Sequence, residues 1–322
     1  MYKRQELKIR LSNVNIKVDN TSRYASGGRD FRTDEWLNCY YGVSAAMVQG
    51  KGNTKIELDG QNVLDSHEVP YQAGLRKQGE GTLIITDETN DEGKKITTPK
   101  SNDSGSLIAK GAGGNGAAGI GGSVAEGTKN ITIEGYATVH AAGGGSGAGI
   151  GGGGIYGDTQ SGDAENIIIR GHSKVTATTL GGAAIGGGYG SESGGSAKGI
   201  VIRDHATVVA KSDGGSWLGN GCAAIGAAGN KDTEAEVIIG TPGATAETED
   251  VHVTAIGHYG SAIGNGAKDT KVTIQGHVTI QTASDDSNSV IGSSRGNVEV
   301  NIKDNASIDP APSAGISSDI AG

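Results

Sequence analysis

The chain has 322 residues, of which 58 are glycine, and aromatic residues make up only 4%. A globular core rich in Phe and Leu is therefore not expected. Collagen is excluded because glycine follows no strict three-residue period and only five prolines are present. The formal net charge of −9, without any basic block, disfavours sequence-independent binding to nucleic acid phosphates. No run of about 18 apolar residues occurs, so the sequence predicts no membrane span.

The two ends of the chain suggest a fragment. Residues 1–5 match the translation of GTG TAT AAG AGA CAG, the end of a common sequencing-library adapter, and we expect them to be an artefact. An export signal would then lie upstream of this fragment. Near the other end, Ala314-Gly315-Ile316 open a further repeat, which favours truncation of the repeat array there.

Residues 6–110 contain short alternating apolar runs, which predict strands separated by loops. Residues 19–43 and 86–104 break this pattern with polar and charged side chains, and we expect them to project from the body of the protein. Trp36, Tyr40 and Tyr41 lie in the first of these loops. They either pack over an open end or form a binding element, and packing is the favoured interpretation.

A four-residue motif, Ala/Ser-x-Ile-Gly, recurs through the rest of the chain. Six copies are present, with their isoleucines at Ile120, Ile150, Ile185, Ile225, Ile263 and Ile291. Looser copies surround Met47, Leu75 and Ile316, and successive copies are 25 to 45 residues apart. This spacing is typical of stacked repeats with loops of variable length.

Each motif is followed by two further runs of alternating β-branched residues. The first run contains the triplets 131–133, 167–169, 200–202, 237–239, 272–274 and 300–302. The second run begins a few residues later, as at Ala137-x-Val139-x-Ala141. Alternation with a period of two predicts half-buried strands, so each repeat supplies three short strands.

Stacked repeats of three strands predict an all-β fold, a right-handed parallel β-helix with three short strands per coil and variable loops. We expect one continuous solenoid, with irregular coils and projecting loops in residues 6–110 and regular coils in residues 111–322. Cys39 and Cys222 lie several repeats apart. We expect both to be free, because a disulfide requires Cα atoms within about 7 Å.

The runs Leu58-Asp59-Gly60, Ala73-Gly74-Leu75, Gly105-Ser106-Leu107, AGIGG, AAIGG and AAIGA resemble the glycine-rich β-helix repeats of large bacterial cell-surface proteins. These proteins are described as adhesin-like or carbohydrate-binding-domain-containing. The resemblance covers about residues 6–317. It implies an exported, non-enzymatic protein at the cell surface or outside the cell, acting as an adhesin or stalk scaffold. It identifies no ligand, because the matching residues are structural.

One column of polar residues flanks the turn that follows each triplet. Its members are Glu134, Tyr136, Arg170, His172, Arg203, His205, Gln275, His277, Lys303 and Asn305, with an insertion at 240–250. The favoured interpretation is a solvated ladder with a Glu134–Arg170 ion pair. The alternative is a binding site for an extracellular polysaccharide or host glycan, with Tyr136, Arg170, His172, Arg203, His205 and His277 as ligand-binding residues. Protonated histidines would add affinity for an acidic glycan below about pH 6.5.

No catalytic or metal-binding constellation stands out. A polysaccharide lyase of this fold would place acidic metal ligands on an outer face, whereas the outward triplet positions are Thr132, Ile168, Val201, Ile238 and Thr273. Acidic residues fall mainly in loops, so we expect no enzyme, metal or cofactor; a polysaccharide lyase or glycosidase remains a second alternative. The aromatic residues Tyr156, Tyr189, Trp217 and Tyr259 form a second candidate strip, although turn packing is favoured for each.

Overall fold

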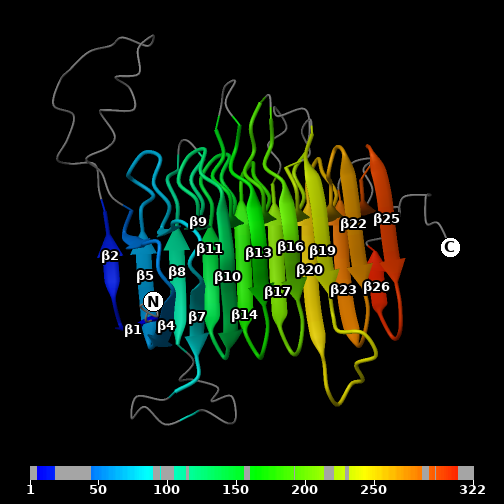
Figure 1. The fold of residues 1–322 in the computed structure, drawn as a ribbon, viewed down its shortest axis with the longest axis horizontal. Helices are drawn as coiled ribbons and strands as arrows, with labels where there is room; N and C mark the ends of the chain where they lie inside the picture. The colour runs from blue at the N-terminus through cyan, green and yellow to red at the C-terminus, as the bar shows by residue number, and fades with distance from the viewer. Residues whose placement is uncertain are drawn as a thin grey trace, which may run out of the picture.

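The computed structural model describes residues 6–18, 45–89, 95, 105–113, 116–155, 160–191, 193–213, 221–228, 232–284, 290–293 and 295–310. Within these ranges the regular secondary structure consists of β-strands, and no helix is present. They form three parallel sheets, A, B and C, which extend side by side along one axis (Figure 1). The prediction of an all-β parallel β-helix with three short strands per coil is therefore confirmed.

Each coil contributes one strand to each sheet, in the order A, B, C. Sheet A contains β1 (Leu7–Ser12), β4 (Thr54–Asp59), β7 (Leu83–Asp87), β10 (Thr128–Gly135), β13 (Ala164–Ile169), β16 (Ala197–Ile202), β19 (Glu234–Ile239), β22 (Asp269–Ile274) and β25 (Asn297–Ile302). Sheet B contains β2 (Asn15–Lys17), β5 (Gln61–Asp65), β8 (Ser106–Lys110), β11 (Thr138–Ala142), β14 (Lys174–Thr179), β17 (Thr207–Ser212), β20 (Val251–Gly257), β23 (Val278–Ser284) and β26 (Ser307–Pro310). Sheet C contains β3 (Met47–Gln49), β6 (Leu75–Lys77), β9 (Ile120–Gly121), β12 (Ile150–Gly151), β15 (Ile185–Gly186), β18 (Ile225–Gly226), β21 (Ile263–Gly264) and β24 (Ile291–Gly292).

The strand register matches the repeats read from the sequence. In sheet C the isoleucine of each motif pairs with its equivalent in the next coil, as in Ile120 with Ile150 and Ile150 with Ile185. The looser copies follow the same register, since Met47 pairs with Leu75 and Leu75 with Ile120. The motif is thus one strand of the coil, and it holds the same place in successive coils.

The interior is filled by columns of β-branched side chains and small residues. Ile131 and Ile133 of β10, Val139 of β11 and Ile150 of β12 are completely buried, as are most of their equivalents in neighbouring coils. Burial of one such side chain stabilises the fold by roughly 1.5 to 3 kcal/mol, so the columns supply most of the driving force for stacking. Outward side chains alternate with them and remain available at the surface.

Glycine in sheet C permits very close approach between coils. Gly186 has a φ of +143°, and a β-carbon there would stand 1.8 Å from the carbonyl oxygen of Gly226 in the next coil. The same arrangement repeats along the column, so the second residue of each two-residue strand is restricted to glycine.

Sheet A contains a bulge in three successive strands. Asn130, Asn166 and Gly199 adopt left-handed backbone conformations in β10, β13 and β16, with φ values of 59°, 54° and 68°. The side-chain amide of Asn166 donates a hydrogen bond to Oδ1 of Asn130 at 2.7 Å. The register shifts between β16 and β19, and no described residue of β19, β22 or β25 has a positive φ. The strands β10, β13 and β16 therefore differ in shape from the following strands β19, β22 and β25.

Several sequence predictions fall outside the described residues. Trp36, Cys39, Tyr40 and Tyr41 lie there, as do residues 1–5, 19–44, 90–94 and 96–104 and the repeat at 314–316. Cys222 is described; it is free, buried and donates a hydrogen bond from Sγ to the carbonyl oxygen of Gly181 at 2.8 Å. Among the described residues, no helix has the length and apolar character needed to cross a membrane.

The two kinds of glycine lead to a paired prediction. Gly186→Ala should lower the free energy of unfolding by about 3 kcal/mol or more, because the new methyl group clashes with the Gly226 carbonyl. Gly199→Asn should stay within about 1 kcal/mol of wild type, because its added β-carbon meets no atom closer than 3.7 Å and asparagine tolerates its backbone conformation. Urea unfolding monitored by circular dichroism measures both. Equal losses in the two variants would contradict this account of the coil contact.

Candidate functional site

The turn from sheet A to sheet B, called here the A–B corner, brings together three of the predicted site residues. Tyr136, His172 and His205 follow β10, β13 and β16 and stack face to face. The ring centroids of Tyr136 and His172 are 5.0 Å apart with planes inclined by 6°, and those of His172 and His205 are 4.6 Å apart with an angle of 4°. The stack follows directly from coil spacing, because equivalent residues of neighbouring strands lie about 4.8 Å apart.

Stacking changes what these rings can offer to a ligand. Both faces of His172 are covered by neighbouring rings, and one face each of Tyr136 and His205 is covered as well. The expectation that a tyrosine face packs on a sugar ring is therefore restricted to the outer face of Tyr136. What the stack presents along its length is a row of ring edges, whose hydroxyl and imidazole nitrogens form hydrogen bonds.

The two predicted arginines differ in their surroundings. Arg170 binds Glu134 of the preceding coil, with Nε and Nη2 at 2.8 Å and 2.5 Å from Oε2, so the predicted ion pair is present. Arg203 forms a weaker ion pair: its Nε is 4.0 Å from Oδ1 of Asp204 and makes no hydrogen bond. Arg203 is thus the better placed of the two to bind an anion.

An insertion separates His277 from the ring stack. Residues 240–250 lengthen the corner between β19 and β20 and extend beyond the neighbouring turns, at the lower edge of Figure 1. The buried Glu249 anchors this insertion by accepting hydrogen bonds from the backbone amides of Asp204 at 3.1 Å and Thr241 at 2.9 Å. His277 lies beyond it, with Nδ1 3.4 Å from Oδ1 of Asp250. The predicted six-residue site is therefore split, and His277 belongs to a separate group.

A buried carboxylate lies on the other side of the stack. Oδ2 of Asp87 accepts a hydrogen bond from the amide of Gly105 at 2.6 Å, and its carbonyl accepts one from the amide of Tyr136 at 2.9 Å. Burial raises the pKa of Asp87 to about 6 despite the hydrogen bond from Gly105. Asp87 helps to position Tyr136, and the sequence analysis missed it because burial is a property of the folded chain.

The outer face of sheet A carries charged residues that the sequence analysis overlooked. Acidic residues lie on its strands, among them Glu165, Glu236, Asp269 and Glu299, so the prediction that acidic residues fall mainly in loops is wrong for this face. The apolar triplets that predict these strands form only their C-terminal parts. Each strand begins a few residues earlier, and these charged residues lie in that earlier part. Their alternation with buried residues along the strand was the available signal.

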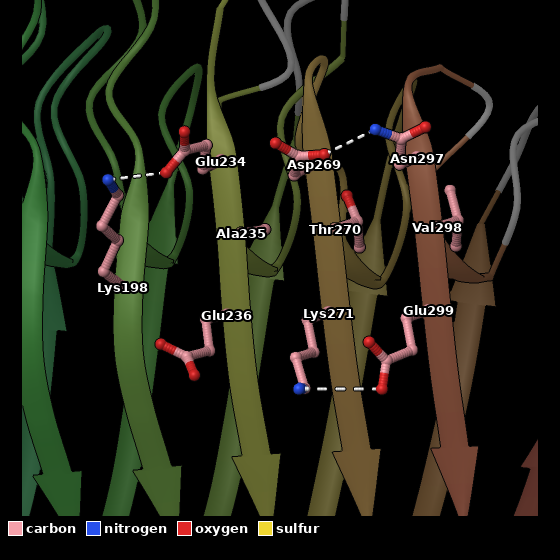
Figure 2. Close-up of a pocket in the computed structure, with 10 residues that line it drawn as sticks. All are labelled: Lys198, Glu234, Ala235, Glu236, Asp269, Thr270, Lys271, Asn297, Val298 and Glu299. Atoms are coloured by element: carbon pink, nitrogen blue, oxygen red, sulfur yellow. Dashed lines mark hydrogen bonds and ion pairs between the residues drawn. The ribbon is translucent and has the colours of Figure 1, made fainter.

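Part of this face is hollow. A pocket of about 390 Å³ lies over β16, β19, β22 and β25, and Glu234 is among the lining residues that Figure 2 draws. Lys198 and Lys268 bind Glu234 at 2.6 Å and 2.8 Å, and these hydrogen bonds lower the pKa of its carboxyl group to about 2. Within the described ranges, no group of three or more His, Cys, Asp or Glu side chains is arranged to hold a metal ion.

The second candidate strip of aromatic residues does not form a continuous surface in the described chain. Tyr189 is buried and packs with Cys222 and Ala228, as turn packing predicts, whereas Tyr259 is 40% exposed. Tyr156 and Trp217 lie outside the described residues.

Comparisons of the chain with protein-family models, with curated proteins and with solved structures found no match.

The ring stack predicts a measurable titration. Burial and the nearby His205 lower the pKa of His172 below 6.5, with Asp204 opposing them. A lowered histidine pKa stabilises the fold above pH 6.5, and this contribution is lost as the pH falls below that value. NMR titration should find His172 ionising below its ordinary range, and Tyr136→Ala should raise its pKa by exposing one ring face. An unchanged titration in Tyr136→Ala would show that stacking does not control this group.

Proposed function

We propose that the chain is a segment of an exported bacterial cell-surface protein and acts as a rigid scaffold of the adhesin or stalk type. The observation that carries this proposal is the sheet A ladder, in which nine strands pair in series from β1 to β25. Such pairing, with a continuous apolar interior, resists bending because each coil is held by its neighbours through backbone hydrogen bonds. The resemblance of the repeats to those of surface proteins supports the location.

Rigidity of this scaffold can be measured between its ends. Lys8 of β1 and Asn301 of β25 face outward in the same column, eight strand intervals apart. Spin labels on Lys8→Cys and Asn301→Cys, with Cys39→Ser and Cys222→Ala, should give a narrow distribution of distances near 38 Å, from the strand spacing of ~4.8 Å. Diluting the labelled protein with unlabelled protein suppresses distances between labels on different molecules. A broad distribution would be incompatible with a rigid spacer.

A second candidate function is favoured by the A–B corner: binding of an acidic polysaccharide or host glycan. Three observations support it. The edges of Tyr136, His172 and His205 form a regular row, Arg203 makes no hydrogen bond through its shielded Nε, and coils with longer connections lie on both sides of the row. A guanidinium whose ion pair is a long contact of 4.0 Å with Asp204 suits a uronate carboxylate or a sulfate, and the ring edges suit hydroxyl groups.

This candidate predicts selective loss of binding on substitution of Arg203. Polygalacturonate and dextran sulfate are the acidic probes, and neutral dextran is the control polymer. Arg203→Ala should weaken binding of an acidic probe about tenfold or more, because a charge-assisted hydrogen bond is lost. Arg170→Ala should have a smaller effect, since Arg170 is held by Glu134. Affinity is measured by isothermal titration calorimetry.

The matched control is Lys211→Ala, which removes one positive charge from an exposed position on sheet B. It should bind the acidic probes as wild type does. Failure of the wild-type protein to bind either acidic polymer would eliminate this candidate. Binding that survives Arg203→Ala unchanged would place the site elsewhere, and equal weakening in Lys211→Ala would indicate attraction by net charge alone.

A further inference from the structure

The outer face of sheet A carries a column of charges that alternate in sign from coil to coil. We call this column the charge ladder; it consists of Lys129, Glu165, Lys198, Glu236, Lys271 and Glu299. Register places Lys129 beside Glu165, Glu165 beside Lys198, Glu236 beside Lys271 and Lys271 beside Glu299. Ala197 of β16 pairs with Ala235 of β19, and Lys198 and Glu236 are the next residues of these two strands. Because the ladder has an even number of alternating charges, a second ladder running in the opposite direction would place a carboxylate opposite every lysine.

Intrachain contacts leave this ladder incompletely paired. Lys129 binds Glu80 at 2.8 Å, Lys198 binds Glu234 at 2.6 Å, and Lys271 lies 3.7 Å from Glu299. By contrast, no hydrogen bond or ion pair is formed by the side chain of Glu165 or Glu236 within the part of the chain that the structure describes. Two exposed carboxylates of the ladder thus lack the close partner that their neighbours have.

The shape of sheet A also differs between the two halves of the ladder. In β13, the bulge leaves two consecutive side chains, Glu165 and Asn166, exposed at the surface. In the other half the bulge is absent, and the pocket of about 390 Å³ lies over its strands β19, β22 and β25 and extends to Lys198 of β16 (Figure 2). One half of the face therefore projects where the other is hollow.

We infer that sheet A is the interface of a homodimer, in which a second copy of this chain lies antiparallel on the same face. A two-fold axis parallel to the strands, between β16 and β19, places Lys198 opposite Glu236 of the second copy. It also places Glu165 opposite Lys271, and Lys129 opposite Glu299. Glu165 and Glu236 then both meet a lysine, and each bulged half faces the hollow half of the other copy. Such an interface is isologous, because the same patch serves both copies.

This axis leaves six strands, β10 to β25, facing their equivalents in the second copy, because β1, β4 and β7 lie beyond the overlap. Six strands spaced by ~4.8 Å and about 20 Å long present roughly 580 Å² per copy. This area is smaller than the roughly 800 Å² per partner of a standard interface, and it suits a dimer of moderate affinity. Beside the ladder, Ile168, Val201 and Ile238 form a partly exposed aliphatic strip in register, which supplies an apolar centre between charged columns.

A competing explanation attributes the alternation to intrachain stability alone, because like charges directly opposite in a sheet are unfavourable. The two explanations differ in the behaviour of complementary variants. Lys198→Glu places two carboxylates opposite each other across the two-fold axis, and Glu236→Lys places two lysines there. A mixture of the two variants restores both opposite-charge pairs in a heterodimer, whereas no intrachain contact is restored by mixing.

Sedimentation equilibrium tests the dimer. Wild-type protein should dimerise, and each single variant should dissociate at least about tenfold more readily, since like-charge contacts replace attractive ones twice per dimer. The equimolar mixture of Lys198→Glu and Glu236→Lys should recover the wild-type dimer. Circular dichroism establishes that each variant is folded, and Lys174→Glu, an exposed charge reversal on sheet B, should dimerise normally.

Three results would overturn the proposal. The first is a wild-type protein that stays monomeric over a wide concentration range, as the intrachain explanation requires. The second is a mixture of the two variants that associates no better than either alone. The third is equal weakening by Lys174→Glu, which would place the interface outside sheet A.

Discussion

Every surface feature of this protein depends on hydrogen bonding in register between successive coils. A one-residue slip in any strand would turn its buried column of Ile or Val outward, so the apolar interior enforces the register. Because the register is enforced, each outward position becomes a column with a spacing close to that of the strands. The ring stack at the A–B corner and the charge ladder on sheet A are two such columns. The residues of both columns are positioned by the repeating coil, so neither column requires additional secondary structure.

Turn length decides where a column can continue. Tyr136, His172 and His205 stack because three successive coils cross the A–B corner with the same short turn. The insertion at 240–250, anchored by Glu249, ends that regularity and leaves His277 with Asp250 instead. Stacking also turns the ring faces toward each other. The corner therefore presents a row of ring edges beside Arg203, which favours an acidic ligand with hydroxyl groups over one recognised by ring faces.

The two columns favour different roles for the two surfaces. The A–B corner carries an arginine whose Nε makes no hydrogen bond and ring-edge polar atoms, and it lies at an edge of the solenoid where a polymer has access. Sheet A is broad and carries charges of both signs, and its bulged strands β10, β13 and β16 lie beside the hollow over β19, β22 and β25, which suits a protein surface of matching shape. A scaffold that pairs through sheet A would leave its A–B corners open, so the proposals for the two surfaces are compatible.

Residue order alone was enough to predict the coil. The motif at Ile120 and its equivalents, the triplets and the alternating runs became the strands of three sheets, because burial at a fixed period appears directly as an alternation of residue types. It also placed Arg170 next to Glu134 correctly. The folded chain was needed to establish that three predicted site residues stack while His277 lies apart, that Asp87 is buried, and that the charges before the triplets form a ladder. These features depend on backbone register, bulges and turn paths between residues that lie far apart in the sequence, and sequence periodicity carries no distance information of that kind.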